Sequence, residues 1–212
     1  MEAKLKNQVT EFIRKNLRWI ILLLCIVVFW EILENIFQNE IGQFDNIIYS
    51  FVSQHITPMT TTIFKIITNL GGAIVILVVT LCILLFVKDK KYGIYVTINL
   101  VVITLINQIL KNIIQRPRPT EFRIIDEVGY SFPSGHSMVS MAFYGFLIYL
   151  TYKNVQNKYL KWISCIILSI LIILIGISRI YLGVHYASDV IGGFCFSIGY
   201  LIIFTKIIKK DS

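Results

Sequence analysis

The chain has 212 residues, of which 56% are hydrophobic and only 15% are charged, and its mean hydropathy is +0.74. Soluble domains usually carry about 25% charged residues, so this composition argues against a soluble globule and excludes a disordered chain. The formal net charge of +8 would suggest nucleic acid in a soluble protein. Here the charges lie between apolar runs, so no nucleic-acid partner is expected.

Uncharged stretches follow one another along the chain and predict membrane-spanning helices. A span needs about 20 apolar residues, and slightly shorter ones are completed by flanking amphipathic residues. The first candidate, Trp19–Trp30, is short, but its helix can continue through Phe37. The others are Ile66–Val87, Tyr92–Leu110, Ser137–Tyr152, Trp162–Ser178 and Val190–Thr205. We predict an all-α fold, an integral membrane bundle of six transmembrane helices, forming a single domain over residues 1–212.

The first span has the basic prelude and apolar stretch of a signal peptide. The segment Trp30-Glu31-Ile32-Leu33 lacks the small residues of a cleavage site, so we expect an uncleaved anchor. The cysteines all lie in apolar runs without metal-ligand spacing, and we expect neither a disulfide framework nor a zinc site. They are Cys25, Cys82, Cys165 and Cys195.

Basic residues favour the cytoplasmic ends of membrane spans, and this rule predicts the orientation. Most of the 20 Lys and Arg residues fall near the two termini, between the second and third spans, or between the fourth and fifth. We therefore expect a multi-pass protein of the cell membrane with both termini in the cytoplasm. The basic residues that run against the rule are Lys65, Lys111, Arg116, Arg118, Arg123 and Arg179.

The run from Lys111 to Pro119 follows the third predicted span. Pro117 and Pro119 disfavour helix at the residues before them, so we expect Lys111 in the last helical turn and both arginines in extended backbone. Three cations would then meet at one mouth of the bundle. Alone, this pattern is equally typical of a basic helix C-terminus that is ended by proline.

A second pattern, Pro133-Ser134-Gly135-His136, directly precedes the fourth span. Gly135 supplies backbone freedom, Ser134 is a good helix cap, and the free N–H groups at a helix start bind anions. An ordinary turn that opens a helix would have the same form, but it does not require His136. An imidazole beside a phosphate-sized site can donate a proton to a leaving oxygen.

A third pattern links Arg179, His185 and Asp189 between the fifth and sixth spans. If the sixth helix begins before His185, His185 and Asp189 share one face and the carboxylate can bond one imidazole nitrogen. The other nitrogen is then free to act as a nucleophile. In isolation, a His–Asp hydrogen bond that closes a short loop is the simpler interpretation. Arg179 favours the functional one, because an ionised side chain at depth costs about 2–3 kcal/mol and usually has a partner or ligand.

Together the three patterns resemble the signature of the lipid phosphate phosphatase superfamily, the type-2 phosphatidic acid phosphatases. The resemblance implies that phosphate oxygens are held by Lys111, Arg118 and Arg179, with hydrogen bonds from Ser134 and Gly135. It further implies that His185 attacks phosphorus, Asp189 orients His185, and His136 protonates the leaving group before water resolves a phosphohistidine. Because Arg116-Pro117 repeats the Arg-Pro pair two residues early, the choice of Arg118 rests on family spacing.

The resemblance also implies that no metal or other cofactor is needed, since fixed cations can neutralise the phosphate. The expected substrate is a membrane lipid phosphate or diphosphate, bound on the extracytoplasmic face. Bacterial enzymes that act on undecaprenyl diphosphate or phosphatidylglycerol phosphate are the nearest analogues. The same fold could act on phosphatidic acid or diacylglycerol diphosphate, and a non-catalytic carrier could use the same cationic site. A carrier, however, has no use for an Asp-oriented nucleophile.

Segments outside the three patterns are assigned to the surface or to packing. Residues 31–62 carry apolar side chains at near-helical spacing, and we expect this segment to lie along the membrane interface and border the lipid entrance. His55 within it has no motif around it and is interpreted as a surface residue. Gly71-Gly72 and Gly192-Gly193 are expected to allow close approach of neighbouring helices.

Overall fold

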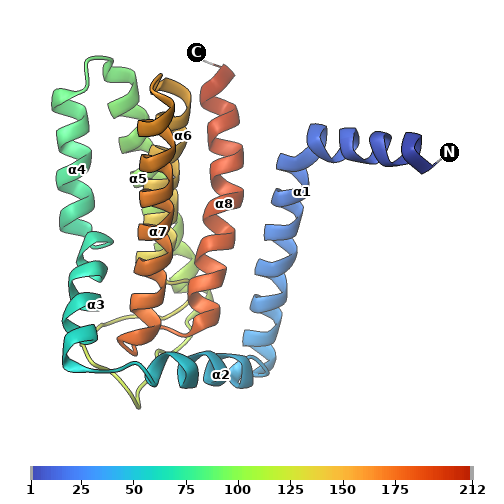
Figure 1. Ribbon diagram of the computed structural model, residues 1–212. Coiled ribbons are helices and arrows are strands. Elements are labelled where there is room, and N and C mark those ends of the chain that lie inside the picture. Colours follow the sequence, from blue (N-terminus) through green and yellow to red (C-terminus); the bar gives the residue numbers. More distant parts are fainter. Residues whose placement is uncertain (1, 211–212) are drawn as a thin grey trace.

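The computed structural model describes the backbone of residues 2–210 and the side chains of residues 10–209. The secondary structure of these residues is entirely helical, which confirms the predicted all-α class (Figure 1). The helices are α1 (Glu2–Gln38), α2 (Gly42–Ser53), α3 (Pro58–Leu70), α4 (Ala73–Phe86), α5 (Lys90–Ile114), α6 (Gly135–Asn154), α7 (Lys158–Tyr181) and α8 (Ala187–Lys210).

Four helices of the described chain are long and apolar enough to cross a membrane: Thr10–Gln38 of α1, α5, α7, and Ala187–Lys209 of α8. The pair α3 and α4 meets at a bend of 44° and makes a fifth span if it is counted as one. α6 has 20 residues and contains Ser, Gly and Tyr among its apolar side chains, and it is not one of these four helices. The count of six spans therefore stays a prediction.

The predicted span Ile66–Val87 is not one continuous helix, because the helix is interrupted at Gly71-Gly72. A Cβ atom at Gly71 would lie 2.6 Å from Cγ2 of Ile175 and 2.8 Å from Oγ of Ser140. The glycine pair thus allows the close helix approach that we predicted, and it also ends α3.

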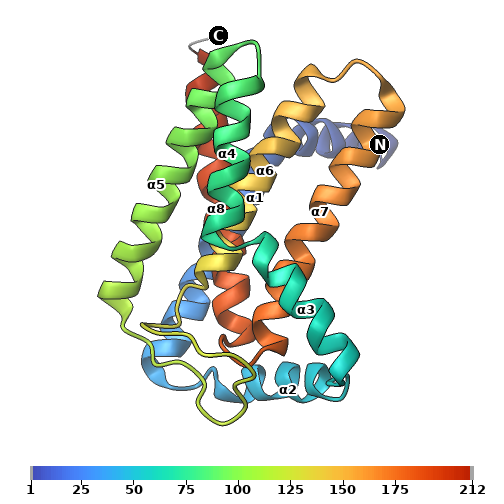
Figure 2. The ribbon, with the colours of Figure 1, turned by 90° about the vertical axis from the view of Figure 1, so that its left-hand side faces the viewer.

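α6 occupies the middle of the bundle, where it packs against α5, α7 and α8 (Figure 2). Phe143 and Phe146 of α6 are fully buried in the main apolar cluster. A helix surrounded by protein does not need an apolar exterior. This position explains why α6 can carry buried serines such as Ser137 and Ser140.

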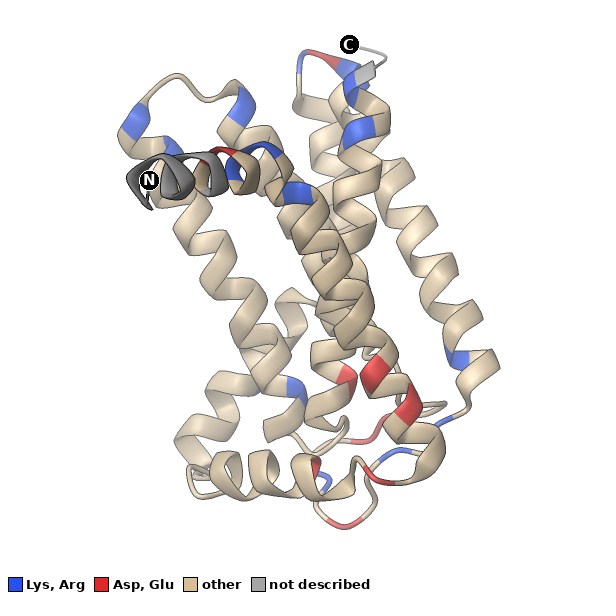
Figure 3. Ribbon diagram, turned by 90° about the vertical axis from the view of Figure 1, so that its right-hand side faces the viewer, with Lys and Arg blue, Asp and Glu red and all other residues tan. Residues whose placement is uncertain are grey.

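One end of the bundle is covered by α2, which lies crosswise to the long helices, and by the irregular loop 115–134 (Figures 1 and 2). Acidic residues gather toward this end, whereas Lys and Arg concentrate at the opposite end, around the α4–α5 and α6–α7 connections and the end of α8 (Figure 3). The crosswise position of α2 is the one expected of an interfacial helix. His55 is exposed, as predicted.

Candidate active site

A cavity of about 340 Å³ lies between α5, the start of α6, the loop 115–134 and the α7–α8 connection. The predicted site residues that line it are Lys111, Arg118, Gly135, His136 and His185. The other predicted residues, Ser134, Arg179 and Asp189, are buried beside the cavity. Ser134 contacts Ser137, Arg179 contacts Glu127, and Asp189 contacts His185. The fold therefore gathers at one place side chains that the sequence separates by up to 78 positions, from Lys111 to Asp189.

His185 lies in the connection before α8, not on the helix, because α8 begins at Ala187. The shared helix face that we considered for His185 and Asp189 is therefore wrong. Nδ1 of His185 nevertheless lies 3.2 Å from Oδ2 of Asp189. The same oxygen accepts the backbone N–H of Tyr186 at 2.9 Å. A carboxylate in the first helical turn caps the orphan donors of the helix start and so points back toward His185.

The contacts of His185 define its tautomer. Nη1 of Arg118 lies 3.1 Å from Nε2 of His185. A guanidinium only donates hydrogen bonds, so Nε2 carries a lone pair and the ring proton sits on Nδ1, facing Asp189. Burial lowers the pKa of His185 to about 4, with Arg118 and Arg179 acting in the same direction, even though Asp189 opposes this shift. His185 is thus a neutral imidazole whose unprotonated nitrogen lies at the cavity.

The connection that carries His185 depends on Gly183, whose φ is 68°. A Cβ atom at Gly183 would collide with the carbonyl oxygen of Phe122. The backbone N–H of Ile124 donates to the carbonyl of Leu182 at 3.0 Å, which pairs this connection with the loop 115–134. Glycine is required here both for its left-handed conformation and for the lack of a side chain.

The start of α6 forms another wall of the cavity. Oγ of Ser134 accepts a hydrogen bond from the hydroxyl of Ser137 at 3.0 Å and lies 3.5 Å from its backbone nitrogen. Ser134 is therefore the predicted N-cap, and its fully buried side chain is already engaged. Gly135 and His136 follow in the first turn, where free N–H groups and the positive end of the helix dipole favour an anion.

Glu127 in the loop 115–134 is a site residue that sequence reasoning missed. It has no motif around it, and only the folded loop brings it to the cavity. Its Oε1 accepts a hydrogen bond from Nη2 of Arg179, and its Oε2 lies 3.9 Å from Nη2 of Arg118. Burial alone would raise the pKa of the Glu127 carboxyl, but Arg179, His136 and Arg118 outweigh it and hold the pKa below its ordinary value. A carboxylate thus lies between two arginines predicted to hold phosphate.

Arg179 is held from two sides. Its side chain is 1% exposed, and Nη1 donates to Oγ1 of Thr68 at 2.7 Å, opposite the contact of Nη2 with Glu127. Within the described chain, Nε of Arg179 has no hydrogen-bond partner. A buried guanidinium with one unused donor is suited to an anionic ligand.

Residues 91–212 match the family description of the PAP2 superfamily. The chain belongs to this superfamily. Among curated proteins, it is similar to phosphatidylglycerophosphatase B of Bacillus subtilis (strain 168), with 37% identity over 101 residues, which cover 47% of this chain and 49% of that protein. The match thus spans about half the length of that relative. It is also similar to the undecaprenyl-diphosphatase of Sulfolobus acidocaldarius, with 26% identity over 191 residues and 85% of each chain covered.

Two solved structures share the architecture. A crystal structure of a transmembrane PAP2-type phosphatidylglycerolphosphate phosphatase from Bacillus subtilis is similar with a TM-score of 0.80 and 26% identity, covering 90% of this chain and 97% of that one. Aquifex aeolicus LpxE is similar with a TM-score of 0.63 and 22% identity, covering 75% and 93% of the respective chains. The second likeness supports the fold alone. All predicted site residues lie within the region that matches the PAP2 superfamily.

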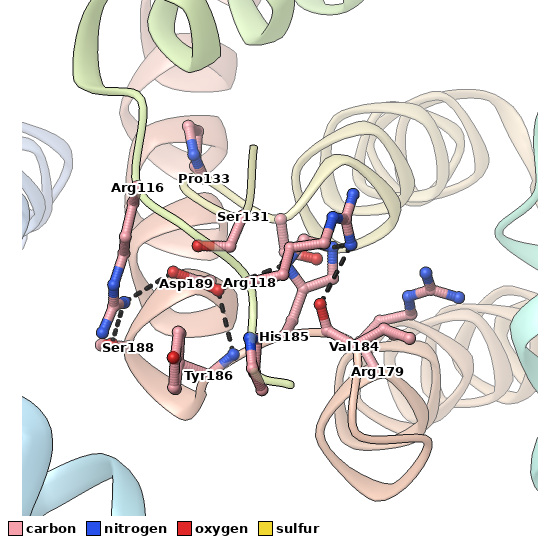
Figure 4. A network of polar contacts seen from close by, with 12 residues as sticks. Arg116, Arg118, Ser131, Pro133, Arg179, Val184, His185, Tyr186, Ser188 and Asp189 are labelled. Atoms are coloured by element: carbon pink, nitrogen blue, oxygen red, sulfur yellow. Dashed lines mark hydrogen bonds and ion pairs between the residues drawn. The ribbon is translucent and has the colours of Figure 1, made fainter. Parts of the chain in front are cut away.

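In this PAP2 protein, Arg116 and Arg118 have different surroundings. Arg118 lines the cavity, whereas Arg116 does not. Arg116 instead donates from Nη1 to Oδ1 of Asp189 at 2.7 Å and to Oγ of Ser188 at 2.8 Å (Figure 4). Its Nη2 donates to Oδ2 of Asp45 at 2.7 Å. Both terminal nitrogens of Arg116 are therefore occupied by protein acceptors. Asp45, in α2, is a second residue that sequence reasoning did not select, and unlike Glu127 it is fully buried.

Proposed function

We propose that the protein is a phosphatase that removes a phosphate group from a membrane lipid by way of a phosphohistidine on His185. The observation that carries the proposal is the pair of contacts on this ring. Nδ1 faces the carboxylate of Asp189, and Nε2 lies at a cavity that also holds Arg118, Lys111 and His136. An oriented, neutral imidazole beside fixed cations is an arrangement for nucleophilic attack on phosphorus.

In the first step, the lone pair of Nε2 on His185 forms a bond to phosphorus. The bond between phosphorus and the bridging oxygen of the lipid breaks, and His136, which would be protonated only beside the bound anionic phosphate, gives its proton to that oxygen. The leaving group is a lipid alcohol when the substrate is a monophosphate, or a lipid monophosphate when it is a diphosphate. Asp189 stabilises the positive charge that develops on His185.

In the second step, water resolves the phosphohistidine. His136, now neutral, accepts a proton from the water molecule as its oxygen attacks phosphorus. The P–N bond breaks, inorganic phosphate leaves, and Nε2 of His185 regains its lone pair. Each histidine has then returned to its starting protonation state, so the cycle needs no external acid or base.

The charge of the transferred phosphate is balanced by the chain's own cations, and the proposal assigns no metal or other cofactor. Arg118 contacts Nε2 of His185 in the free protein. It would turn its donors toward the phosphate oxygens when substrate arrives, which frees the nucleophile. Lys111 and Arg179 would supply further positive charge, and the N-terminal amides of α6 at Gly135 would add hydrogen bonds beside the cap formed by Ser134.

We place the site on the extracytoplasmic side of a membrane that six spans cross, with α6 as the central one. The concentration of Lys and Arg at the opposite end of the bundle supports this orientation (Figure 3). The crosswise helix α2 would then lie at the outer interface, level with lipid headgroups. Lipid tails would remain in the bilayer while the phosphate enters the cavity.

The favoured substrates are undecaprenyl diphosphate and phosphatidylglycerol phosphate. The names of the two curated relatives, an undecaprenyl-diphosphatase and a phosphatidylglycerophosphatase, support this choice. The roles proposed for the cavity residues concern only the phosphate, so phosphatidic acid and diacylglycerol diphosphate belong in the same test panel.

The test is phosphate release by detergent-solubilised protein from this panel of lipid phosphates. We expect turnover by the wild type, loss of turnover in His185→Ala, and full turnover in His55→Ala, which removes an exposed histidine outside the site. If the wild type binds the lipids but releases no phosphate from any of them, the protein is a carrier and the phosphatase proposal is wrong.

A further inference from the structure

The catalytic machinery proposed above assigns a role to only one member, Asp189, of a buried group of charged side chains. It consists of Asp45, Arg116 and Asp189, which are 2%, 8% and 0% exposed. We infer that Arg116 and Asp45 are positioning residues, which hold the carboxylate of Asp189 and thereby the ring of His185. This inference rests on the proposed function, because the effect it describes is on the attack by His185.

Asp189 is held through both of its oxygens (Figure 4). Oδ2 contacts Nδ1 of His185 at 3.2 Å and the backbone N–H of Tyr186 at 2.9 Å. Oδ1 accepts from Nη1 of Arg116 at 2.7 Å. The last torsion of an aspartate side chain has a broad, weakly restricted distribution. The bond from Arg116 therefore restrains a rotation that would turn the carboxylate out of the plane in which His185 needs it.

Asp45 in turn holds Arg116 and the start of α8. Its Oδ2 accepts from Nη2 of Arg116 at 2.7 Å and from the hydroxyl of Ser188 at 2.8 Å. Its Oδ1 accepts the backbone N–H of Ser188 at 2.8 Å. Asp45 thus binds the residue next to Asp189 as well as the arginine that holds Asp189. It connects α2 to the α8 turn that sets the direction of the carboxylate.

Apolar packing already attaches α2 to the bundle at this place. Ile48, Tyr49 and Val52 of α2 pack against a buried cluster of Ile180, Ala187 and Val190. Buried ion pairs add little net stability compared with apolar side chains of similar size, because desolvation of the charges offsets their attraction. The polar group is therefore better explained by the geometry it imposes on Asp189 than by attachment of α2.

Asp45→Asn is the first variant, because it keeps the size of the side chain and removes the charge. We expect kcat to fall roughly 10²-fold, the loss typical of a small misplacement of a reacting group, with KM nearly unchanged because the phosphate-binding cations stay in place. Glu40→Gln is the matched control. It makes the same chemical change at an exposed position close to Asp45, and we expect wild-type kcat.

Arg116 is tested by two variants whose charges differ. Arg116→Lys keeps the charge but cannot reproduce the forked contact with Asp45 and Asp189, so we expect kcat to fall while the pH profile stays in place. Arg116→Met removes the charge that offsets Asp189. The uncompensated carboxylate then favours the imidazolium form of His185. Because attack needs the neutral ring, we expect the acid limb of kcat to move about one pH unit higher.

The other ionisable groups that face His185 or its partners are unchanged in these variants. They come from the loop 115–134, α7, the α7–α8 connection, α6, α5 and α2, and they are Arg118, Glu127, Arg179, Tyr186, His136, Lys111 and Asp45. If the acid limb of kcat shifts in Arg116→Met and not in Arg116→Lys, the shift is therefore caused by the uncompensated charge of Asp189. A purely structural role would lower stability without moving the limb.

The decisive comparison uses only variants that thermal unfolding and size-exclusion chromatography show to be folded. Wild-type kcat in Asp45→Asn and in Arg116→Lys would overturn the inference. If Asp45→Asn does not fold, Arg116→Lys decides. Failure of the proposed function has a different signature, since it would leave the wild type itself without phosphate release and His185→Ala indistinguishable from it.

Discussion

Glu127 is predicted to compete with phosphate for two arginines of the site. Its carboxylate contacts Arg179 through one oxygen and faces Arg118 through the other, at 3.9 Å. A phosphate bound by the same two arginines must displace this carboxylate and then lie close to its charge. Glu127→Gln keeps the shape of the side chain and removes the charge, so inorganic phosphate should bind the variant more tightly.

The size of the effect follows from the geometry. A phosphate on the two guanidinium groups would lie about 5 Å from a displaced Glu127, and unit charges at that distance repel by about 3 kcal/mol at an effective dielectric constant of 20. The Glu127 side chain is 28% exposed. Water and salt therefore reduce the repulsion to about 1–2 kcal/mol, which corresponds to roughly a 5–30-fold change in affinity.

The assay is the inhibition constant of inorganic phosphate against hydrolysis of a lipid phosphate, measured at constant ionic strength. We expect this constant to fall by that factor in Glu127→Gln and to stay at the wild-type value in Asp126→Asn, which alters the exposed neighbouring carboxylate. An unchanged or weaker inhibition in a folded Glu127→Gln protein would contradict competition between Glu127 and phosphate.

Three further predictions concern the nucleophile, its loop and the charge balance. Because the pKa of His185 is near 4, its ring nitrogen signals in nitrogen NMR should remain those of the neutral Nδ1–H form at pH 5.5, about one unit below the ordinary histidine pKa. A titration of these signals with a midpoint near pH 6.5 would contradict this prediction. Gly183→Ala should lose stability and activity through its collision with the carbonyl of Phe122, whereas Gly129→Ala, with φ 77° and open space, should cost only about 1 kcal/mol in thermal unfolding. Equal losses in the two variants would show that the collision is unimportant. Phosphate release should persist in excess chelator, because fixed cations balance the phosphate charge; loss of activity that added metal restores would refute this assignment.

Much of the site could be predicted because its residues belong to short local patterns. Proline after Lys111 places the cations just beyond a helix, and serine before Gly135 predicts the start of α6, as the structure confirms. His185 and Asp189 contact each other although the predicted helix register was wrong, since a carboxylate that caps a helix start reaches back to the preceding residues.

The rest depends on tertiary contacts that no local pattern encodes. Asp45 reaches Arg116 and Ser188 across more than 70 positions of sequence, and Glu127 lies in a loop whose path follows from its contacts with the helices. Because both Arg116 and Arg118 precede a proline, the choice of Arg118 rested on family spacing alone, and only the folded chain shows that Arg118 lines the cavity whereas Arg116 does not. The sequence predicted close helix approach at Gly71-Gly72, but a single apolar run does not reveal that the helix also breaks there.

The central claim is that phosphate passes through a covalent bond to Nε2 of His185. It is tested most directly by mixing the protein with substrate radiolabelled in its terminal phosphate, quenching in alkali during turnover, and mapping the label by peptide analysis. The account predicts a label that is stable to alkali and lost in acid, carried by the peptide that contains His185 and absent from His185→Ala. Turnover without any protein-bound label under rapid quenching, or a label on another side chain, would contradict it.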